Sequence, residues 1–326
     1  MHPQFSVIFL TTLIGAGQGL LLALFTAELG ELFGLVPAQD PHWFYMHGSA
    51  IAFLVTGAGL AASFFHLGRP ARAWRSAARW RTSWLSREVI VLPAFMGVTL
   101  LYGITHLLGL GAALATLPSG APVGATLVLG ATGTLLAIAL YVCTGMIYAC
   151  LPFLREWASP LTVVNFVLLG CASGFALAAA FATLTAPLLV RFYTASALIL
   201  TLLGFASRAA SLVRNARLRP KSTLQTAIGI KHPRIVQKAQ GFMGGSFNTR
   251  EFFHGRSAAA MRLIRRLFIM GTFVLPALLL GSALAGASNA LIVAAFVVQY
   301  LGLLAERWYF FAQSNHPQNL YYQAIA

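Results

Sequence analysis

His66 and Glu88 are ionisable residues that stand where one long apolar segment ends and the next begins. Ionisable side chains at a membrane boundary are costly unless they are paired or hydrated, which makes both residues functional candidates. Imidazole titrates near neutral pH, and a carboxylate can pass protons to water. A proton-coupled quinone reaction needs both groups, so the pair predicts a quinone site. The alternative is structural: a boundary histidine bonded to a carbonyl, and a glutamate in the first turn of a helix that Ser86 caps.

The stretch that joins His66 to Glu88 is basic and aromatic and contains no acidic residue. It holds six arginines and three tryptophans, which are Arg69, Arg72, Arg75, Arg79, Arg81, Arg87, Trp74, Trp80 and Trp84. A basic aromatic loop between two apolar segments is typical of a membrane surface. We therefore add Arg69, Arg87 and Trp84 to the candidate quinone site. For the two arginines, snorkelling to the interface is the alternative.

The sequence shows no pattern typical of a bound metal. His47 and His106 lie near the far ends of their apolar segments, at similar depth, and paired histidines can ligate haem b. Each lies at a boundary rather than within a segment, so we expect ordinary interfacial histidines and no haem. Cys143, Cys150 and Cys171 lack the spacing of a disulfide framework or an iron–sulfur cluster. Such a chain is non-catalytic alone, and electron transfer would need redox centres in a partner.

The composition is that of a polytopic membrane protein. Of 326 residues, 58% are hydrophobic and 9% charged, whereas soluble proteins carry about 25% charged residues. A span needs roughly 20 apolar residues, and this length predicts an all-α fold of eight transmembrane helices in a single membrane domain, residues 1–326. The predicted spans cover about 6–27, 45–65, 88–109, 123–149, 160–184, 190–210, 263–284 and 286–306.

The spans divide into two sets of four, about 1–158 and 160–326, and each set places its large basic loop between its second and third span. An even number of spans per half gives both halves the same orientation, as in parallel repeats. Small residues at close spacing also predict close contacts between helices. They are Gly15, Gly17 and Gly19 in the first span and Gly170 with Gly174 in the fifth.

The basic residues predict the orientation. Of 22 lysines and arginines, all but Arg191 fall on one side of the predicted spans. The positive-inside rule places that side, with both termini, in the cytoplasm of a cell whose inner membrane the bundle crosses. The first loop, with Glu28, Glu31 and Asp40, faces outward. The net charge of +15 is then expected to meet anionic lipid headgroups and protein partners rather than nucleic acid.

The sixth loop, about 211–262, is the largest segment outside the predicted spans. It is too short and too polar to be an independent enzyme domain, so we interpret it as a cytoplasmic docking platform for a soluble partner. The alternative is a solvated charge run against lipid headgroups. The candidate contact residues are Phe242, Met243, Phe247, Arg250, Phe252 and Phe253.

Four motifs carry a resemblance to a known family. HLGRPARAW, WRTSWLSREV, MGGSFNTREFFHG and the terminal ERWYFFAQSNHPQNLYYQ resemble the membrane-anchor subunit of dimethyl sulfoxide reductase-type molybdoenzymes, which serve anaerobic electron transport. The resemblance covers essentially the whole chain, including the eight spans. The first twenty residues and the tail are most similar to the anchor subunits of sulfite dehydrogenases within this group.

The resemblance implies a membrane subunit without haem or iron–sulfur cluster. Such a subunit anchors an iron–sulfur subunit and a molybdopterin catalytic subunit, and exchanges electrons with menaquinone or ubiquinone. By motif position, the quinone-site histidine of the family corresponds to His66 and its carboxylate to Glu88. Both directions of electron flow stay open, because dimethyl sulfoxide reductases consume quinol and sulfite dehydrogenases reduce quinone.

Two other classes of function compete with a quinone-linked anchor. A membrane transporter would also suit two parallel halves, but carriers usually need charged residues at mid-depth, and Glu28, Glu88 and Arg191 all lie near span ends. A purely structural tether would hold the same partners without a quinone site. Substitution of His66 separates the tether from the quinone-linked anchor.

Overall fold

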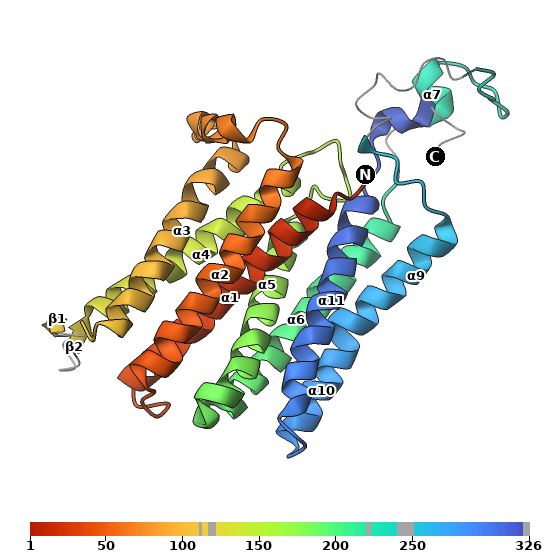
Figure 1. Ribbon diagram of the computed structural model, residues 1–326. Coiled ribbons are helices and arrows are strands. Elements are labelled where there is room, and N and C mark those ends of the chain that lie inside the picture. Colours follow the sequence, from red (N-terminus) through yellow and green to blue (C-terminus); the bar gives the residue numbers. More distant parts are fainter. Residues whose placement is uncertain (111–112, 117–121, 220–222, 240–250, 322–326) are drawn as a thin grey trace.

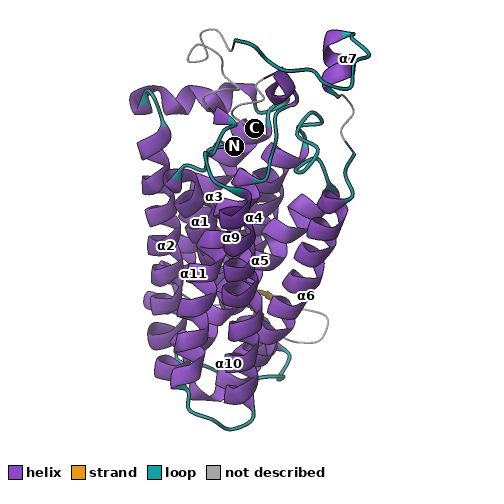
Figure 2. Ribbon diagram, turned by 90° about the vertical axis from the view of Figure 1, so that its right-hand side faces the viewer, coloured by secondary structure: helices purple, strands orange, loops and turns teal. Residues whose placement is uncertain are grey.

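The computed structural model describes residues 1–326 except for 111–112, 117–121, 220–222, 240–250 and 322–326. The described residues form a bundle with eight helical segments that are long and apolar enough to cross a membrane (Figure 1). Figure 2 shows the same bundle from the side, with its helices roughly parallel and its loops gathered at the two ends. The predicted all-α fold of eight spans is therefore confirmed.

The first span is α1 Phe5–Leu32. The second span consists of π-helical Pro41–Met46, α2 His47–Ser63 and 3-10-helical Phe64–His66. The third and fourth spans are α3 Trp84–Leu107 and α4 Ala125–Ala149. The fifth span is α5 Pro160–Thr185, and the sixth is α6 Val190–Ala216 with a preceding 3-10 turn Pro187–Leu189. The seventh span consists of α9 Ala258–Ile269, π-helical Met270–Val274 and α10 Leu275–Leu284. The eighth span is α11 Ala290–Ala312. Shorter elements are the 3-10 helices Pro70–Arg79 and Pro317–Tyr321, strands β1 Ala113–Thr116 and β2 Pro122–Gly124 of an antiparallel hairpin, and α7 Leu224–Ile228.

Most helix boundaries lie a few residues from the predicted ones, and two of these differences concern candidate residues. Helix α3 begins at Trp84, and the hydroxyl of Ser83 caps it by accepting a hydrogen bond of 3.3 Å from the backbone N–H of Ser86. Ser83, rather than Ser86, is therefore the N-cap. Helix α1 continues to Leu32, so Glu28 lies within the helix and not in the loop that was predicted to contain it.

The centre of the bundle is the crossing of α1 and α5. A β-carbon on Gly19 or Gly174 would overlap the backbone of the other helix, and one on Gly17 would lie 2.9 Å from the carbonyl oxygen of Ala52 in α2. These glycines let helix backbones touch, which strengthens dispersion contacts inside a membrane. The close contacts predicted from the glycine spacing are confirmed.

The packing of the first four spans recurs in the last four. Helix α1 packs on α2 and α4, and α5 packs on α6 and α11. Helix α4 also reaches α5, and α11 reaches α1 in the same way. This is the arrangement that two parallel four-helix halves would give.

The N-terminus and the end of α11 lie at the same end of the bundle, which we call the basic end (Figure 1). The connections 67–83 and 150–159 and the described parts of 217–257 also lie there, and these three stretches of sequence carry most of the lysines and arginines. The 3-10 helix Pro70–Arg79 crosses this end at an angle to the bundle axis (orange in Figure 1). Arg191 lies at the opposite end, at the start of α6.

Candidate functional site

His66 lines a cavity of about 510 Å³ at the basic end. The walls come from the N-terminal segment, the end of the second span, the segment before α9, and α11. Its polar and aromatic lining includes His2, Ser6, Phe65, His254, Arg256 and Trp308. Ligand sites commonly have a volume of roughly 300–1,000 Å³ and a few convergent polar groups in a mainly apolar wall. The cavity is therefore large enough for an aromatic ring of quinone size.

The imidazole of His66 carries an unused hydrogen-bonding atom. Its Nδ1 atom is buried and has no hydrogen-bond partner among the described residues. A buried polar atom without a partner is costly, and the described residues therefore leave the hydrogen-bonding capacity of this imidazole partly unfilled. The sequence identified His66 correctly as a residue at a boundary, and the structure adds the cavity that it faces.

His254 lies across the same cavity and was not singled out from the sequence. The backbone N–H of Arg256 donates to His254 Nδ1 at 3.0 Å, so a neutral ring carries its proton on Nε2. Burial lowers the pKa of His254, and the N-terminal amine and Arg256 act in the same direction. The Nε2–H group is consequently a hydrogen-bond donor on a neutral imidazole.

The local sequence explains how His254 reaches the cavity. The next residue, Gly255, has φ +62°, a left-handed conformation that favours glycine and turns the chain back toward α9. The ring of His254 meets the indole of Trp308 edge to face, with centroids 6.3 Å apart. The signal that was available in the sequence is the motif NTREFFHG, which ends with this histidine and glycine.

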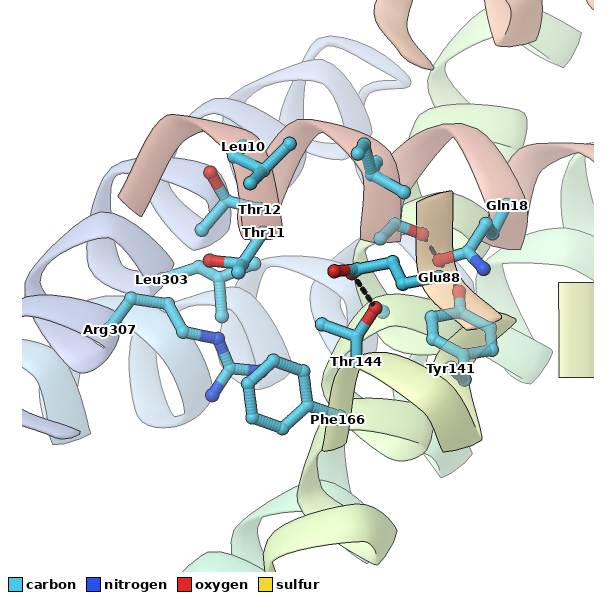
Figure 3. Close-up of a pocket in the computed structure, with 13 residues that line it drawn as sticks. Leu10, Thr11, Thr12, Gln18, Glu88, Tyr141, Thr144, Phe166, Leu303 and Arg307 are labelled. Carbon is cyan, nitrogen blue, oxygen red and sulfur yellow. Dashed lines mark hydrogen bonds between the residues drawn. The ribbon is translucent and has the colours of Figure 1, made fainter. Parts of the chain in front are cut away.

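Glu88 occupies a different and enclosed pocket between α1, α4, α5 and α11 (Figure 3). Its carboxylate accepts a hydrogen bond from the hydroxyl of Thr144 and is 8% exposed. Other polar lining groups are Thr11, Gln18, Tyr141 and Arg307. The free space is about 10 Å³, which is roughly one water molecule. A quinone ring does not fit there.

The structure does not bring His66 and Glu88 into one pocket, although consecutive antiparallel spans predicted this. Among the described residues, none lines both spaces. Both spaces border α1, the cavity at Ser6 and the pocket at Thr11, and these two residues are about 7.5 Å apart along the helix axis. Glu88 turns inward to Thr144, whereas His66 lies on the side of the N-terminal segment.

A buried ion cluster borders the Glu88 pocket. The Arg307 Nη1 atom lies 3.0 Å from Glu306 Oε2, and the Arg208 Nε atom lies 2.7 Å from Glu306 Oε1. The guanidinium of Arg307 also stacks over the ring of Phe166 at 3.9 Å. With Glu88, these residues form two acids and two bases inside the bundle, so their formal charges cancel.

The charged residues of this cluster are buried between helices rather than exposed in loops. Arg208, Glu306 and Arg307 are 2%, 0% and 3% exposed. The sequence placed Arg208 among the loop charges and Glu306 with Arg307 at a boundary. Burial is tolerated because the charges are paired, and that pairing across α6 and α11 has no signature in sequence spacing.

The remaining predicted residues of the quinone site lie elsewhere. Arg69 is exposed at the start of the 3-10 helix Pro70–Arg79. Arg87 donates hydrogen bonds of 2.9 Å to the carbonyl oxygens of Trp80 and Arg81, and its guanidinium lies 4.1 Å from the ring centroid of Trp84. Among the described residues that line the cavity or the pocket, Arg69, Trp84 and Arg87 do not occur. Arg87 and Trp84 instead stabilise the 67–83 connection.

Of the predicted docking residues, Phe242, Met243, Phe247 and Arg250 lie outside the described residues. Phe253 is half-buried, and Phe252 is buried in an aromatic cluster that includes Trp157 and Phe310. The carbonyl oxygen of Phe252 also accepts a hydrogen bond of 3.4 Å from Asn319. Phe252 therefore fixes the segment that carries His254 against the end of α11.

The two histidines weighed as haem ligands have separate surroundings. The Nε2 atom of His106 lies 3.8 Å from Glu28 Oε1, and Tyr102 donates a hydrogen bond of 2.8 Å to Glu28 Oε2. His47 instead stacks on Trp43, with centroids 5.0 Å apart. Within the part of the chain that the structure describes, no group of three or more His, Cys, Asp or Glu residues is placed to hold a metal ion.

Comparison with known proteins agrees with the fold and with the sequence motifs. The model of the family described as the DMSO reductase anchor subunit (DmsC) matches residues 1–305. The chain is also similar to a sulfite dehydrogenase subunit of Allochromatium vinosum, with 57% identity over 327 aligned residues that cover 100% of both chains. Together with the eight spans, these matches show that the chain belongs to the DMSO reductase anchor subunit (DmsC) family of multi-pass membrane proteins.

Proposed function

We propose that this chain anchors a molybdoenzyme complex in the membrane and exchanges electrons between the quinone pool and an iron–sulfur partner subunit. The observation that carries the proposal is the cavity at the basic end. It combines ring-sized volume with a His66 nitrogen that has no partner in the described part of the chain and with the Nε2–H group of His254. Glu88 cannot face the ring, because its pocket holds about one water molecule.

The two imidazoles suit the chemistry of a quinone ring. A quinone has two carbonyl oxygens on opposite sides of the ring, and reduction adds a proton to each. His66 and His254 come from different elements, so they can meet different oxygens of one ring. His254 donates through Nε2–H, and the His66 imidazole, which lines the same cavity, can exchange a proton with the ring or with water.

Glu88 acts from behind this cavity. Its carboxylate and Thr11 border the same pocket, and Thr11 lies five residues along α1 from Ser6, which lines the cavity. Arg307 lines this pocket as well and is paired with Glu306 rather than with Glu88. We therefore assign Glu88 a positioning and proton-holding role in α1 and α11 packing, and not contact with the quinone.

The basic end is the side on which the soluble partners dock. Because 21 of the 22 lysines and arginines were predicted to lie on one side, the positive-inside rule places the basic end in the cytoplasm of a bacterium. A basic surface attracts an acidic partner surface, and the molybdopterin subunit then joins through the iron–sulfur subunit. Reporter fusions after residue 230 should read cytoplasmic and fusions after residue 115 should read external, and the reverse pattern would contradict this orientation.

The matched relative favours one direction of electron flow. Its description as a sulfite dehydrogenase subunit supports sulfite as the terminal substrate and quinone as the electron acceptor. The family description supports the second candidate, in which quinol electrons reduce dimethyl sulfoxide. Purified complex assayed with sulfite and quinone, and with quinol and dimethyl sulfoxide, separates the two.

The decisive experiment compares the complex with its soluble subunits alone. Quinone-linked turnover is expected only when this chain is present, whereas turnover with an artificial dye is expected in both preparations. Equal quinone-linked rates with and without the chain would contradict the proposal and would mean that the chain is a purely structural tether. Dye-linked turnover controls for the integrity of the soluble subunits.

A further inference from the structure

An apolar groove continues from the His66 cavity along the outside of the bundle. Its free volume is about 440 Å³. The floor is α11, with Leu304 and Ala305, and the walls are α1, with Ile8 and Phe9, and the start of α9. Figure 1 shows α11 between α1 and α9 at the basic end, as this lining requires. The groove therefore runs along helices that form membrane spans.

The groove and the cavity are joined. Phe5, Arg256 and Trp308 line both spaces. Of the described residues that line the groove, only Arg256 is charged, and it lies at the shared end. A molecule with a polar ring and an apolar tail would find a polar compartment followed directly by an apolar one.

We propose that this groove binds the polyisoprenoid tail of the quinone while its ring occupies the His66 cavity. The inference rests on the proposed function and adds a second subsite to it. The tail would enter from the lipid between α1 and α9 and lie along α11. The ring would then reach the two histidines without leaving the membrane surface.

The exposure of the groove residues fits a ligand that arrives from lipid. Phe5 is 68% exposed, Leu263 is 56% exposed and Phe9 is 39% exposed. These apolar side chains flank the opening. Arg262, Arg265 and Arg266 are exposed on α9 and keep its first turns near lipid headgroups by snorkelling. The groove thus lies where a quinone would pass from the bilayer to the basic end.

A lipid acyl chain is the other molecule that such a groove accommodates. Continuity with the cavity favours the quinone tail, because the ring and the tail of one molecule would fill both spaces. Tethering raises the effective concentration of the tail at the groove once the ring is bound. A separate lipid chain gains no such advantage, and its binding in the groove would not depend on the chain length of the quinone.

The test measures how strongly the complex prefers a long-chain quinone over an analogue with the same ring and no tail. Ala260 borders the groove, so Ala260→Trp should fill it, whereas Ala259 is exposed and does not line it. Ala260→Trp should lower the ratio of the two kcat/KM values at least about tenfold, because several methylene groups lose their apolar contact. Ala259→Trp is the matched control and should keep the wild-type ratio.

A second measurement uses the unaltered complex. A quinone with a photoreactive diazirine in its tail should label residues of α1, α9 or α11 near the basic end. Labelling elsewhere, an unchanged ratio in Ala260→Trp, or an equal loss with both quinones would overturn the tail subsite. If His66→Ala leaves quinone turnover intact, the ring site of the proposed function is wrong. If His66→Ala removes turnover while the Ala260→Trp ratio is unchanged, only the tail subsite fails.

Discussion

The cavity at His66 and the pocket at Glu88 border successive stretches of α1, yet they differ in volume and in the elements that enclose them. The cavity has about 510 Å³ of space and is built from chain segments outside the spans as well as helices. The pocket has about 10 Å³ and is built from helices alone. The comparison teaches that two ionisable residues at adjacent span ends can have unrelated environments.

The direction of the side chains produces this difference. Glu88 belongs to the buried stripe of α3 with Leu92, Phe95 and Thr99, at helical spacing. Such a stripe points into the bundle, so Glu88 meets Thr144 and not the basic end. His66 ends its span in a 3-10 turn outside that stripe, where the N-terminal segment and the segment with His254 approach it.

The largest effect on stability is expected when the buried ion cluster beside the Glu88 pocket loses its only described acid, Glu306. Glu306→Gln leaves Arg208 and Arg307 buried with a weakened partner, and breaking a buried ion pair costs about 3–5 kcal/mol. We expect a lower thermal unfolding temperature for the detergent-solubilised chain, read by size-exclusion chromatography after heating. Glu251→Gln at an exposed position is the control and should unfold like the wild type. Equal unfolding of both variants would mean that the cluster is not structural.

In the cavity at the basic end, His66→Ala should lower turnover rather than stability. Loss of a group that exchanges protons with the reacting ring lowers rates by about 10²–10⁴-fold, so quinone-linked turnover should nearly vanish. Membrane insertion, partner binding and dye-linked turnover should persist. His106→Ala, at the opposite end of the bundle, is the matched control. An unchanged quinone-linked rate would place the site elsewhere and leave His66 as a structural residue.

Substitution of His254 tests whether the His66 cavity contains a second residue that bonds to the quinone. His254→Ala should lower kcat/KM for quinone about tenfold, the effect of one hydrogen bond to a ligand, with dye-linked turnover unchanged. His254→Gln keeps an N–H donor and should recover part of the loss. His232 is an exposed histidine of the same connection, so His232→Ala should have no effect. Identical rates for His254→Ala and His232→Ala would remove His254 from the site.

The sequence was sufficient to predict the fold and one residue that lines the cavity, His66. Long apolar runs and the glycine spacing predicted eight spans and the α1–α5 contact, because membrane insertion and close packing depend on local composition. It did not reach His254, Arg208 or the separation of His66 from Glu88. Those depend on which helices become neighbours and on how segments distant in sequence meet. The stripe at Glu88, Leu92 and Phe95 was readable as an inward face, and that pattern would have separated the two residues.

Of the three substitutions tested by quinone-linked turnover, Glu88→Gln should have the smallest effect, and it distinguishes a residue outside the quinone cavity from residues that line it. Glutamine keeps the size and a hydrogen-bond acceptor for Thr144 but removes the negative charge and the titratable proton. We expect kcat to fall several-fold with little change in KM, since the ring does not contact this pocket and only proton supply or α1 position is altered. Thr144→Val removes the donor and should shift kcat in the same direction. A rise in KM as large as the fall in kcat would instead show that Glu88 touches the quinone, and the two regions would then have to be joined into one site.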